Sequence, residues 1–392
     1  MSVRSKETKA TGSRLVNGLI ITSAVLSVIM VCVLVILVLT IIKKDNTGTA
    51  PAQELQPATA EELQPARFSS GSVYVNHNGW TSMRMGSSIT IYHEGSEKYK
   101  LTGKMDYNLL AAEEGLYYTK DQGFYYCSYA DGSETLLMEY SSPIHPIGMI
   151  GEKFFFTSAP DNAMQFSILQ YDSITQAVSE LGLPELWGDV EMIFCNDHFY
   201  YIGGRTDVST RPLYEVDIEK GEARQIDPAC GSGLLSYGSK VYYSHAEPAG
   251  SIPDAAMSLT ELDTETGTKK EISRTAPGKM KTPVFADSNY IYLLSYGAEE
   301  SRIVQLNVKD GTETAVITGP GLSVIGECEN GFYYSSTGQP ENTVLFQFNE
   351  SDGSTKEIGT VKGSVLGYAD NYVYYSIYNQ NTKAQEYYRT RF

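Results

Sequence analysis

The sequence has little cysteine, histidine and tryptophan. Its 392 residues include five cysteines, five histidines and two tryptophans. The cysteines are isolated, at Cys32, Cys127, Cys195, Cys230 and Cys328. This spacing excludes the dense disulfide framework of a small secreted domain and the paired ligands of a structural zinc site. We therefore expect no metal and no cofactor, and we expect the cysteines to be small buried apolar side chains.

Catalytic motifs are also missing. The sequence contains no His-Glu-x-x-His helix, no Gly-x-Ser-x-Gly elbow, no phosphate-binding glycine loop and no Cys-x-x-Cys pair. Acidic residues recur at Asp131, Asp310 and Asp352, but each falls in a separate turn, whereas a calcium site needs several oxygen ligands around one ion. These acids favour turn formation, and no residue is predicted to be catalytic.

Positive charge is scarce beyond residue 44. Residues 1–44 carry six basic side chains and one acidic one, a charge of +5, and because the whole chain carries −17, residues 45–392 carry −22. A surface this acidic repels phosphate backbones. The composition argues against nucleic acid as a partner.

One long hydrophobic run lies near the N-terminal end. Residues 19–42 contain no charge and no proline, and as a helix at ~1.5 Å per residue they would cover roughly 36 Å, enough to cross a bilayer. The run is longer than the ~7 to 15 apolar residues of a cleaved signal peptide. Four basic residues precede it and two come after it, which places residues 1–17 in the cytoplasm. The sequence predicts a single-pass membrane protein with a transmembrane helix over 18–42, the lipid bilayer as a partner, and its C-terminal part outside the cytoplasm.

The segment 43–68 differs in composition from residues 69–392. It repeats the sequence ELQPA at 54–58 and 62–66 and is rich in Pro, Ala, Gln and Glu. Such a composition lacks the apolar side chains needed for a core. We expect a disordered spacer that holds the rest of the chain away from the membrane.

An aromatic phrase recurs through the remaining residues. It reads GLYYTK at 115, KFFFTS at 153, KVYYSH at 240 and GFYYSS at 331. A period of ~40 to 50 residues built from strands is typical of propeller blades. The central aromatics, spaced 38 to 50 residues apart, are Tyr74, Tyr117, Phe155, Tyr200, Tyr242, Tyr292, Tyr333 and Tyr374.

Each repeat predicts four antiparallel strands, a to d, with the aromatic phrase as strand b. Strands c and d are expected to form a hairpin, because a glycine stands between them. Tight hairpin turns need residues with positive φ, which glycine adopts without steric cost. The aromatics of strand b point to both faces of the strand, as expected for a blade covered on both sides by its neighbours. The glycines expected at the hairpin tips are Gly95, Gly132, Gly221, Gly267, Gly311 and Gly353.

The fold prediction is therefore an all-β propeller over 69–392, with eight blades or alternatively seven. In the first repeat, Tyr74 is assigned to strand b, and residues 66–70 give at most a vestigial strand a. The last repeat reaches Phe392 with strands a, b and c. We expect the ring to close by pairing of the strands at its two ends.

The aromatic strand, together with the hairpin containing Asp-Gly-Ser that comes after it, resembles the bacterial LDL-receptor-related-protein-like β-propeller domains of unknown function. The resemblance covers roughly residues 70–392 and implies the propeller fold. It implies no activity, since that family has none to transfer. The Trp of the receptor repeat is Tyr or Phe here and its closing Asp is mostly absent, so any role of that Asp is not carried over.

The alternation of strand direction separates two rims. The a–b and c–d turns emerge on one, which we call the short-turn rim, and the b–c and d–a connections emerge on the other, the long-loop rim. Function tends to lie on variable loops held by a rigid scaffold. The candidate ligand-binding residues, all assigned to the long-loop rim, are Trp80, Trp187, Arg205, Arg211, His245 and Asp254. An exposed Trp beside charged side chains suits sugar rings or peptide, but each Trp could instead fill a gap between blades.

These features are compatible with three classes of function. The first is a membrane-tethered extracytoplasmic binding or scaffold module that engages a cell-wall polymer, a peptide or a membrane protein through the long-loop rim. The second is a propeller hydrolase or lyase with its site at the mouth of the central channel. The third is a purely structural or assembly role inside a membrane complex through the anchor helix. Fold alone does not choose among them.

Overall fold

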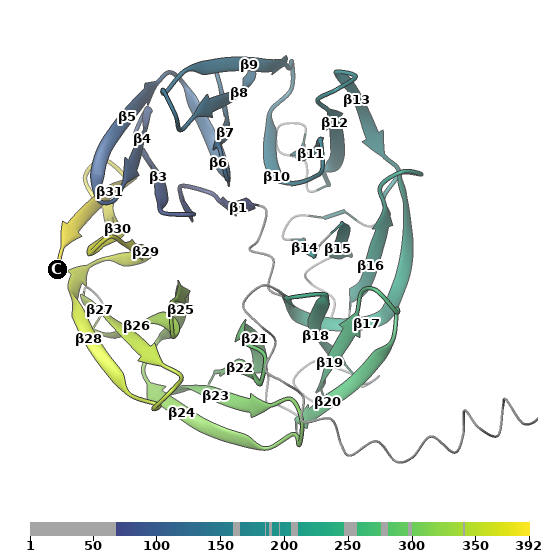
Figure 1. Ribbon diagram of the computed structural model, residues 1–392, viewed down its shortest axis with the longest axis vertical. Helices are drawn as coiled ribbons and strands as arrows, with labels where there is room; N and C mark the ends of the chain where they lie inside the picture. Colours follow the sequence, from purple (N-terminus) through teal and green to yellow (C-terminus); the bar gives the residue numbers. More distant parts are fainter. Residues whose placement is uncertain are drawn as a thin grey trace, which may run out of the picture. The chain divides into compact units, whose positions relative to one another are not determined.

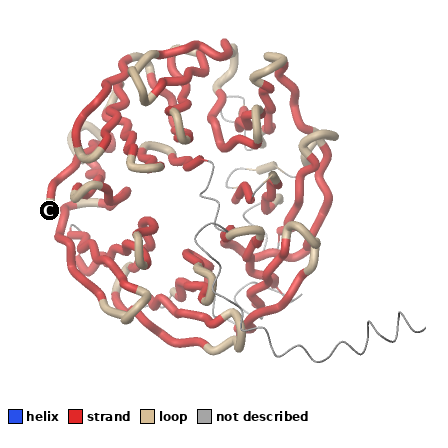
Figure 2. Tube along the Cα trace, in the orientation of Figure 1, coloured by secondary structure: helices blue, strands red, loops and turns tan. Residues whose placement is uncertain are grey.

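The computed structural model describes residues 68–159, 165–184, 186–187, 190–195, 197–204, 211–246, 257–275, 281–296, 300–339 and 342–392. These belong to one compact unit, Glu61–Phe392. They form strands and turns, with no helix among them (Figure 2), so none of the described residues provides a helix able to cross a bilayer. The predicted cytoplasmic segment and transmembrane helix, and all but the last residue of the predicted spacer, lie outside the described residues.

The described strands form seven antiparallel sheets arranged as blades around a ring (Figure 1). One sheet has seven strands because β17 (Glu222–Tyr237) belongs to two blades: its first part pairs with β16 (Arg211–Asp217) and its second part with β18 (Lys240–Ala246). Counting this sheet as two blades gives eight. The prediction of an all-β propeller with four-stranded antiparallel blades is confirmed.

The blades are numbered in chain order, and each begins with its innermost strand. Blade 1 contains β2 (Tyr74–His77), β3 (Trp80–Met85), β4 (Ser88–His93) and β5 (Ser96–Thr102). Blade 2 contains β6 (Met105–Ala112), β7 (Gly115–Lys120), β8 (Gly123–Ser128) and β9 (Glu134–Glu139). Blade 3 contains β10 (Ile144–Ile150), β11 (Lys153–Ser158), β12 (Ser167–Asp172) and β13 (Ala177–Leu181). Blade 4 contains β14 (Glu191–Cys195), β15 (His198–Ile202), β16 and the first part of β17.

The second half of the ring has the same order. Blade 5 contains the second part of β17, β18, β19 (Met257–Asp263) and β20 (Lys269–Thr275). Blade 6 contains β21 (Lys281–Ala286), β22 (Tyr290–Ser295), β23 (Ser301–Asn307) and β24 (Glu313–Gly319). Blade 7 contains β25 (Leu322–Cys328), β26 (Gly331–Gln339), β27 (Asn342–Asn349) and β28 (Thr355–Lys362). Blade 8 contains β29 (Ser364–Ala369), β30 (Tyr372–Asn379) and β31 (Ala384–Arg391).

The predicted hairpin tips are confirmed by the backbone. All six glycines expected at these tips have φ between 68 and 73 degrees. In this left-handed region a side chain is strained, so glycine is required by the turn. At Gly311, for example, the amide donates to the carbonyl of Asn307 at 2.9 Å and closes the turn between β23 and β24.

The recurring aromatics form the cores between blades. On β26, Phe332 is fully buried and its ring lies 5.1 Å from that of Tyr292 on blade 6. The next residue, Tyr333, is half-buried and its ring lies 4.8 Å from that of Tyr368 on blade 8. Successive residues of one strand therefore pack against opposite neighbours. This arrangement explains why strand b is aromatic on both faces.

The first repeat departs from the prediction. Tyr74 lies in β2, the inner strand of blade 1, and strand b of that blade is β3, which begins at Trp80. The two strands are joined by Asn78 and Gly79, which have φ of 48 and 78 degrees. Two consecutive left-handed residues make a tight hairpin turn. The assignment of Tyr74 to strand b was wrong because β3 lacks the aromatic phrase.

The closure prediction also differs from the structure. Strand β1 (Phe68–Gly71) pairs with β6, from Phe68 opposite Ala112 to Gly71 opposite Leu109. It covers the channel-side edge of blade 2, whose backbone groups would otherwise have no partner on that side. Among the described residues no strand joins blade 8 to blade 1. These two blades meet through side chains, including the rings of Tyr74 and Tyr374 at 5.1 Å.

Candidate functional site

Trp80 lies on the short-turn rim, so its predicted place on the long-loop rim was wrong. It comes directly after the Asn78–Gly79 turn, because β3 and not Tyr74 begins strand b. Its ring stacks on His93 at 4.3 Å and on Tyr129 of blade 2 at 4.3 Å, the latter with an interplanar angle of 1 degree. Trp80 therefore fills the gap between blades 1 and 2.

Trp187 lies on the long-loop rim, as predicted, in the connection from β13 to β14. It is half-buried and forms an isolated β-bridge with Gln165. Arg205 and Asp254, which were predicted on the same rim, lie outside the described residues.

Arg211 begins β16 on the long-loop rim and is buried. Its Nη2 lies 3.0 Å from Oε1 of Glu191, at the start of β14. The second oxygen of Glu191 accepts the amide of Gly233 in β17 at 2.6 Å. A buried charge is stable only when it is paired and hydrogen-bonded. The pair links the ends of β14 and β16 on this rim to β17. It therefore stabilises the segment of β17 that passes from blade 4 to blade 5.

His245 lies at the rim end of β18 and is oriented by a buried carboxylate. Its Nδ1 lies 2.9 and 3.0 Å from the two oxygens of Asp227. Asp227 is buried and also accepts the hydroxyl of Tyr243 at 3.0 Å and the amide of Ala229 at 2.9 Å. The His245 side chain retains 32% of its surface. A histidine held at Nδ1 by a carboxylate and partly exposed to solvent has the arrangement of a general base.

The strand register brings Arg211 and His245 into one row. Cys230 of β17 stands opposite Arg211 on one side and opposite His245 on the other. Cys230 is fully buried, and burial, with the charge of Asp227 as the next cause, raises the pKa of its thiol well above the usual value. A buried protonated thiol is a poor nucleophile. The row therefore offers a histidine base and a paired arginine, but no reactive cysteine.

Two exposed tyrosines on the long-loop rim escaped the sequence analysis. Tyr296 comes directly after β22 and is 59% exposed, and Tyr378 lies near the end of β30 and is 52% exposed. Both stand where a strand b leaves its blade. The chain contains 29 tyrosines, so nothing in the sequence distinguished these two from the other tyrosines.

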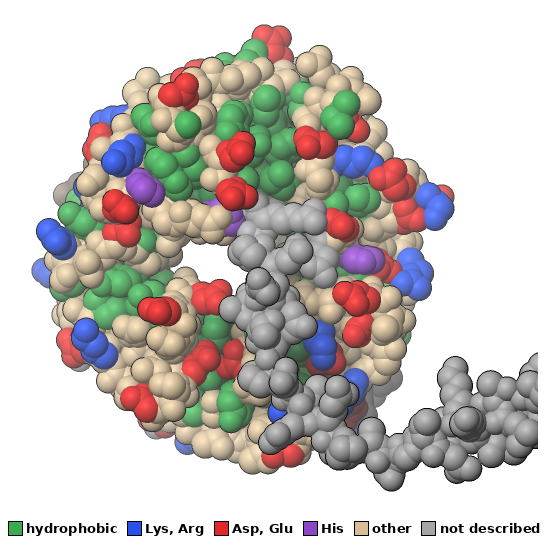
Figure 3. Space-filling model, viewed as in Figure 1, with side chains coloured by type: hydrophobic (Ala, Val, Ile, Leu, Met, Phe, Trp, Pro, Cys, Tyr) green, Lys and Arg blue, Asp and Glu red, His purple; other side chains and the backbone are tan. Residues whose placement is uncertain are grey.

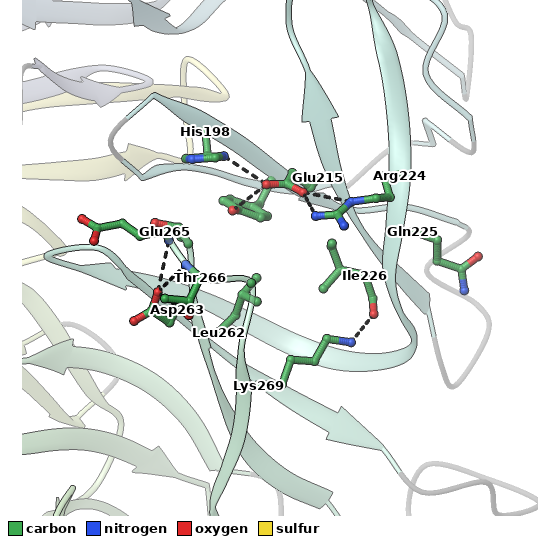
Figure 4. A pocket seen from close by; sticks show the side chains of 13 residues that line it. His198, Glu215, Arg224, Gln225, Ile226, Leu262, Asp263, Glu265, Thr266 and Lys269 are labelled. Carbon is green, nitrogen blue, oxygen red and sulfur yellow. Dashed lines mark hydrogen bonds and ion pairs between the residues drawn. The ribbon is translucent and has the colours of Figure 1, made fainter. Parts of the chain in front are cut away.

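A groove of about 410 Å³ separates blades 4 and 5 on the short-turn rim (Figure 4). On its blade 4 wall, Oε1 of Glu215 lies 3.0 Å from Nδ1 of His198 and accepts a hydrogen bond from the hydroxyl of Tyr200 at 3.0 Å. The other oxygen, Oε2, accepts a hydrogen bond from Nε of Arg224 at 3.2 Å. Burial raises the pKa of Glu215, but the hydrogen bonds from Arg224 and Tyr200 outweigh it and leave the pKa below its usual value. The carboxylate is fully engaged within blade 4. We interpret this network as structural.

The hairpin acids do not converge on an ion. Asp131, Asp310 and Asp352 each accept the backbone amide two residues further on, at 2.8 to 3.0 Å. They cap their own turns, as predicted. No group of three or more metal-ligating side chains is found among the described residues.

No protein-family model and no curated protein sequence matches the chain. Solved structures do match at the level of fold. Dipeptidyl peptidase 4 of Porphyromonas gingivalis is 10% identical, with a TM-score of 0.50 over 84% of this chain and 61% of that chain. The β-propeller domain of the Trilobed protease from Pyrococcus furiosus is 11% identical, with a TM-score of 0.47 over 82% and 95%. Oligogalacturonate lyase of Vibrio parahaemolyticus is 13% identical, with a TM-score of 0.46 over 84% and 98%. At such identities a likeness concerns the fold alone, and the fold of residues 68–392 is a β-propeller.

Proposed function

We propose that the chain is a membrane-tethered extracytoplasmic binding module that engages a cell-wall polymer, a peptide or a membrane protein through its long-loop rim. The observation that carries the proposal is the pair of exposed tyrosines at the ends of strands b, Tyr296 and Tyr378. Tyrosine is enriched at contact surfaces, because its ring is apolar and its hydroxyl forms hydrogen bonds. The partly buried pairs Arg211–Glu191 and His245–Asp227 hold the same rim in place at blades 4 and 5.

The first experiment tests wall-polymer binding. The full chain in lipid nanodiscs is mixed with purified peptidoglycan sacculi and sedimented, beside a variant carrying Tyr296→Ala and Tyr378→Ala. The control is Ile174→Ala, which removes a side chain 76% exposed in a hairpin tip on the short-turn rim. We expect co-sedimentation of the wild type and the control, and its loss in the double variant. Equal co-sedimentation of all three proteins would contradict binding of peptidoglycan through Tyr296 and Tyr378 on the long-loop rim.

The membrane anchor has its own test. Intact cells that express the full chain are treated with a protease, and the C-terminal propeller is detected by antibody. The positive-inside arrangement predicts cleavage of the propeller from outside while residues 1–17 stay protected. Protection of the propeller in intact cells, with cleavage after lysis, would place it in the cytoplasm.

A second candidate is hydrolase or lyase activity, favoured by the His245–Asp227 pair. A base oriented by a buried carboxylate could take a proton from water or from a substrate carbon. This pair lies on the long-loop rim at blade 5 rather than at the expected channel mouth. Activity on a panel of esters, peptides and oligosaccharides that is lost in His245→Gln, with an unchanged melting temperature, would support catalysis.

A further inference from the structure

A second cavity, of about 630 Å³, opens on the central channel at its short-turn mouth. Its walls come from β1 and from the inner strands of three consecutive blades, β25 of blade 7, β29 of blade 8 and β2 of blade 1. This volume lies within the ~300 to 1,000 Å³ range of small-ligand sites. We propose that this channel cavity is a binding site for an uncharged saccharide, a ligand rich in hydroxyl groups and separate from whatever the long-loop rim engages.

Four polar side chains of the channel cavity have no partner among the described residues. Among the described residues, no hydrogen bond or ion pair is made by the side chains of Ser70, Asn76, Asn78 or Glu327, and each of these residues is exposed. Elsewhere in the ring, turn residues such as Asn307 bond their own turn. The amides of Asn76 and Asn78 each offer two donors and an acceptor, the hydroxyl offers both roles, and the carboxylate accepts. Sugar hydroxyls donate and accept in the same combination.

Two tyrosines and a histidine also line the cavity. Tyr74 and Tyr368 contribute aromatic side chains, and aromatic side chains with a polar handle suit ligands that are apolar on one face and polar at the edges. His77 is buried, with Nδ1 3.1 Å from the hydroxyl of Ser69. Burial lowers the pKa of His77 although the charge of Glu113 opposes this, so the imidazole is uncharged at neutral pH. It presents a hydrogen-bonding group rather than a cation.

The charge of the channel cavity excludes anionic sugars. No Lys or Arg lines the cavity, and Glu327 is its one charged side chain. The surrounding protein partly desolvates the Glu327 carboxyl and raises its pKa. On the face shown in Figure 3, acidic side chains gather around the opening of the ring and most Lys and Arg side chains lie toward its circumference. A uronic acid would meet this negative potential without a counter-charge. A neutral sugar would meet hydrogen-bonding groups and the apolar residues Val75, Ile325 and Leu366, and no cation.

The test is isothermal titration calorimetry on the full chain in lipid nanodiscs, because sugar-headed detergents would compete. The probes are cellobiose, maltose and N,N′-diacetylchitobiose, each up to about 20 mM, with digalacturonate as the anionic comparison. We expect at least one neutral disaccharide to bind and digalacturonate not to bind. Each lost hydrogen bond corresponds to roughly tenfold in affinity. We therefore expect Asn76→Ala to weaken binding about tenfold.

The variants separate this site from others and from misfolding. Asn78→Gly keeps the left-handed φ of 48 degrees while removing the amide, so it remains informative if Asn76→Ala lowers the melting temperature. Glu327→Gln should keep neutral-sugar binding and relieve the exclusion of digalacturonate. The matched control is Gln225→Ala, which lies in the groove between blades 4 and 5 and should bind like wild type. The inference is overturned if none of the neutral probes binds, if digalacturonate binds best to wild type, or if the control loses binding while the Asn variants keep it.

Discussion

Arg389 of blade 8 lies over the ring of Tyr92 of blade 1, with its guanidinium carbon 3.9 Å from the ring centre. The same carbon lies 4.5 Å from the ring centre of Tyr372, and Nη1 donates to the carbonyl of Gly95 at 3.1 Å. The amide of Gly95 in turn donates to Asp370 at 2.9 Å. No strand crosses this junction among the described residues, so these contacts close the ring together with the apolar cluster of Met83, Tyr92 and Tyr374.

Removing the arginine should weaken the closure. A cation over two rings and one charge-assisted hydrogen bond correspond to about 2 to 3 kcal/mol together. We expect Arg389→Ala to lower the free energy of unfolding by this amount in urea denaturation. Arg391→Ala, which removes an exposed arginine from the same strand, should stay within about 0.5 kcal/mol of wild type. Equal urea denaturation curves for the two variants would show that other contacts close the ring.

The aromatic strands should behave as one core. Truncating a fully buried ring costs about 3 to 5 kcal/mol, so Phe332→Ala should lower the unfolding midpoint strongly. Tyr333→Ala should also destabilise the domain in the same cooperative transition, because its ring packs on Tyr368. The control is Tyr378→Ala, which removes a ring that is 52% exposed. An unchanged melting curve for Tyr333→Ala would contradict its place in the core between blades 7 and 8.

Stability should fall as pH rises from about 4.5 to about 7. Burial and then the charges of Asp287 and Glu327 raise the pKa of Glu350 to about 7, from an ordinary value of 4.5. Below the ordinary value both the folded and the unfolded chain hold this proton. Between the two values the unfolded chain releases it first, which favours unfolding, and above about 7 the loss is complete.

The variant Glu350→Gln isolates this effect. It should raise the melting temperature at pH 8, change it little at pH 4.5, and flatten the dependence between them. Glu219→Gln, at a side chain 77% exposed, removes the same charge without relieving repulsion and serves as the control. A Glu350→Gln variant no more stable than wild type at pH 8 would show that the charged Glu350 carboxylate does not destabilise the folded chain.

The buried cysteines should resist alkylation while the chain is folded. Burial raises the pKa of Cys127 and Cys195 to about 11, and raises that of Cys230 as well. Thiols react as thiolates. Iodoacetamide at pH 8, with mass spectrometry of the resulting peptides, should label half-buried Cys328 before these three, which react only in urea. Rapid labelling of Cys230 in the folded chain would instead indicate a thiolate activated by His245.

The repeat was readable because blades 2 to 8 follow one packing rule. Strand b is covered on both faces, so it is bulky on both, and hairpin tips such as Gly311 need a left-handed residue. Blade 1 does not follow this rule, and there the predicted strand assignment was wrong. In blade 1 the Asn78–Gly79 turn forms the hairpin between strands a and b, whereas the prediction followed the aromatic residue Tyr74.

The candidate site was less predictable, because its partners are distant in sequence. Arg211 and His245 were chosen for residue type and loop position, and the chain itself does not reveal that Glu191 and Asp227 hold them. Those contacts span 20 and 18 residues and depend on the register of β17 through its irregular stretch between Cys230 and Leu234. The exposure of Tyr296 and Tyr378 was equally hidden, since it depends on where each strand leaves its blade.

The sequence by itself determined the repeat length, the strand order within a blade and the acidic character of residues 45–392, because these depend on local turns, alternation and composition. The tertiary structure alone decided that the ring contains eight blades, that β1 covers blade 2 rather than pairing with blade 8, and that Arg389 meets Tyr92 across the junction. These features depend on contacts between residues up to about 300 positions apart, and such contacts leave no periodic signal in the chain.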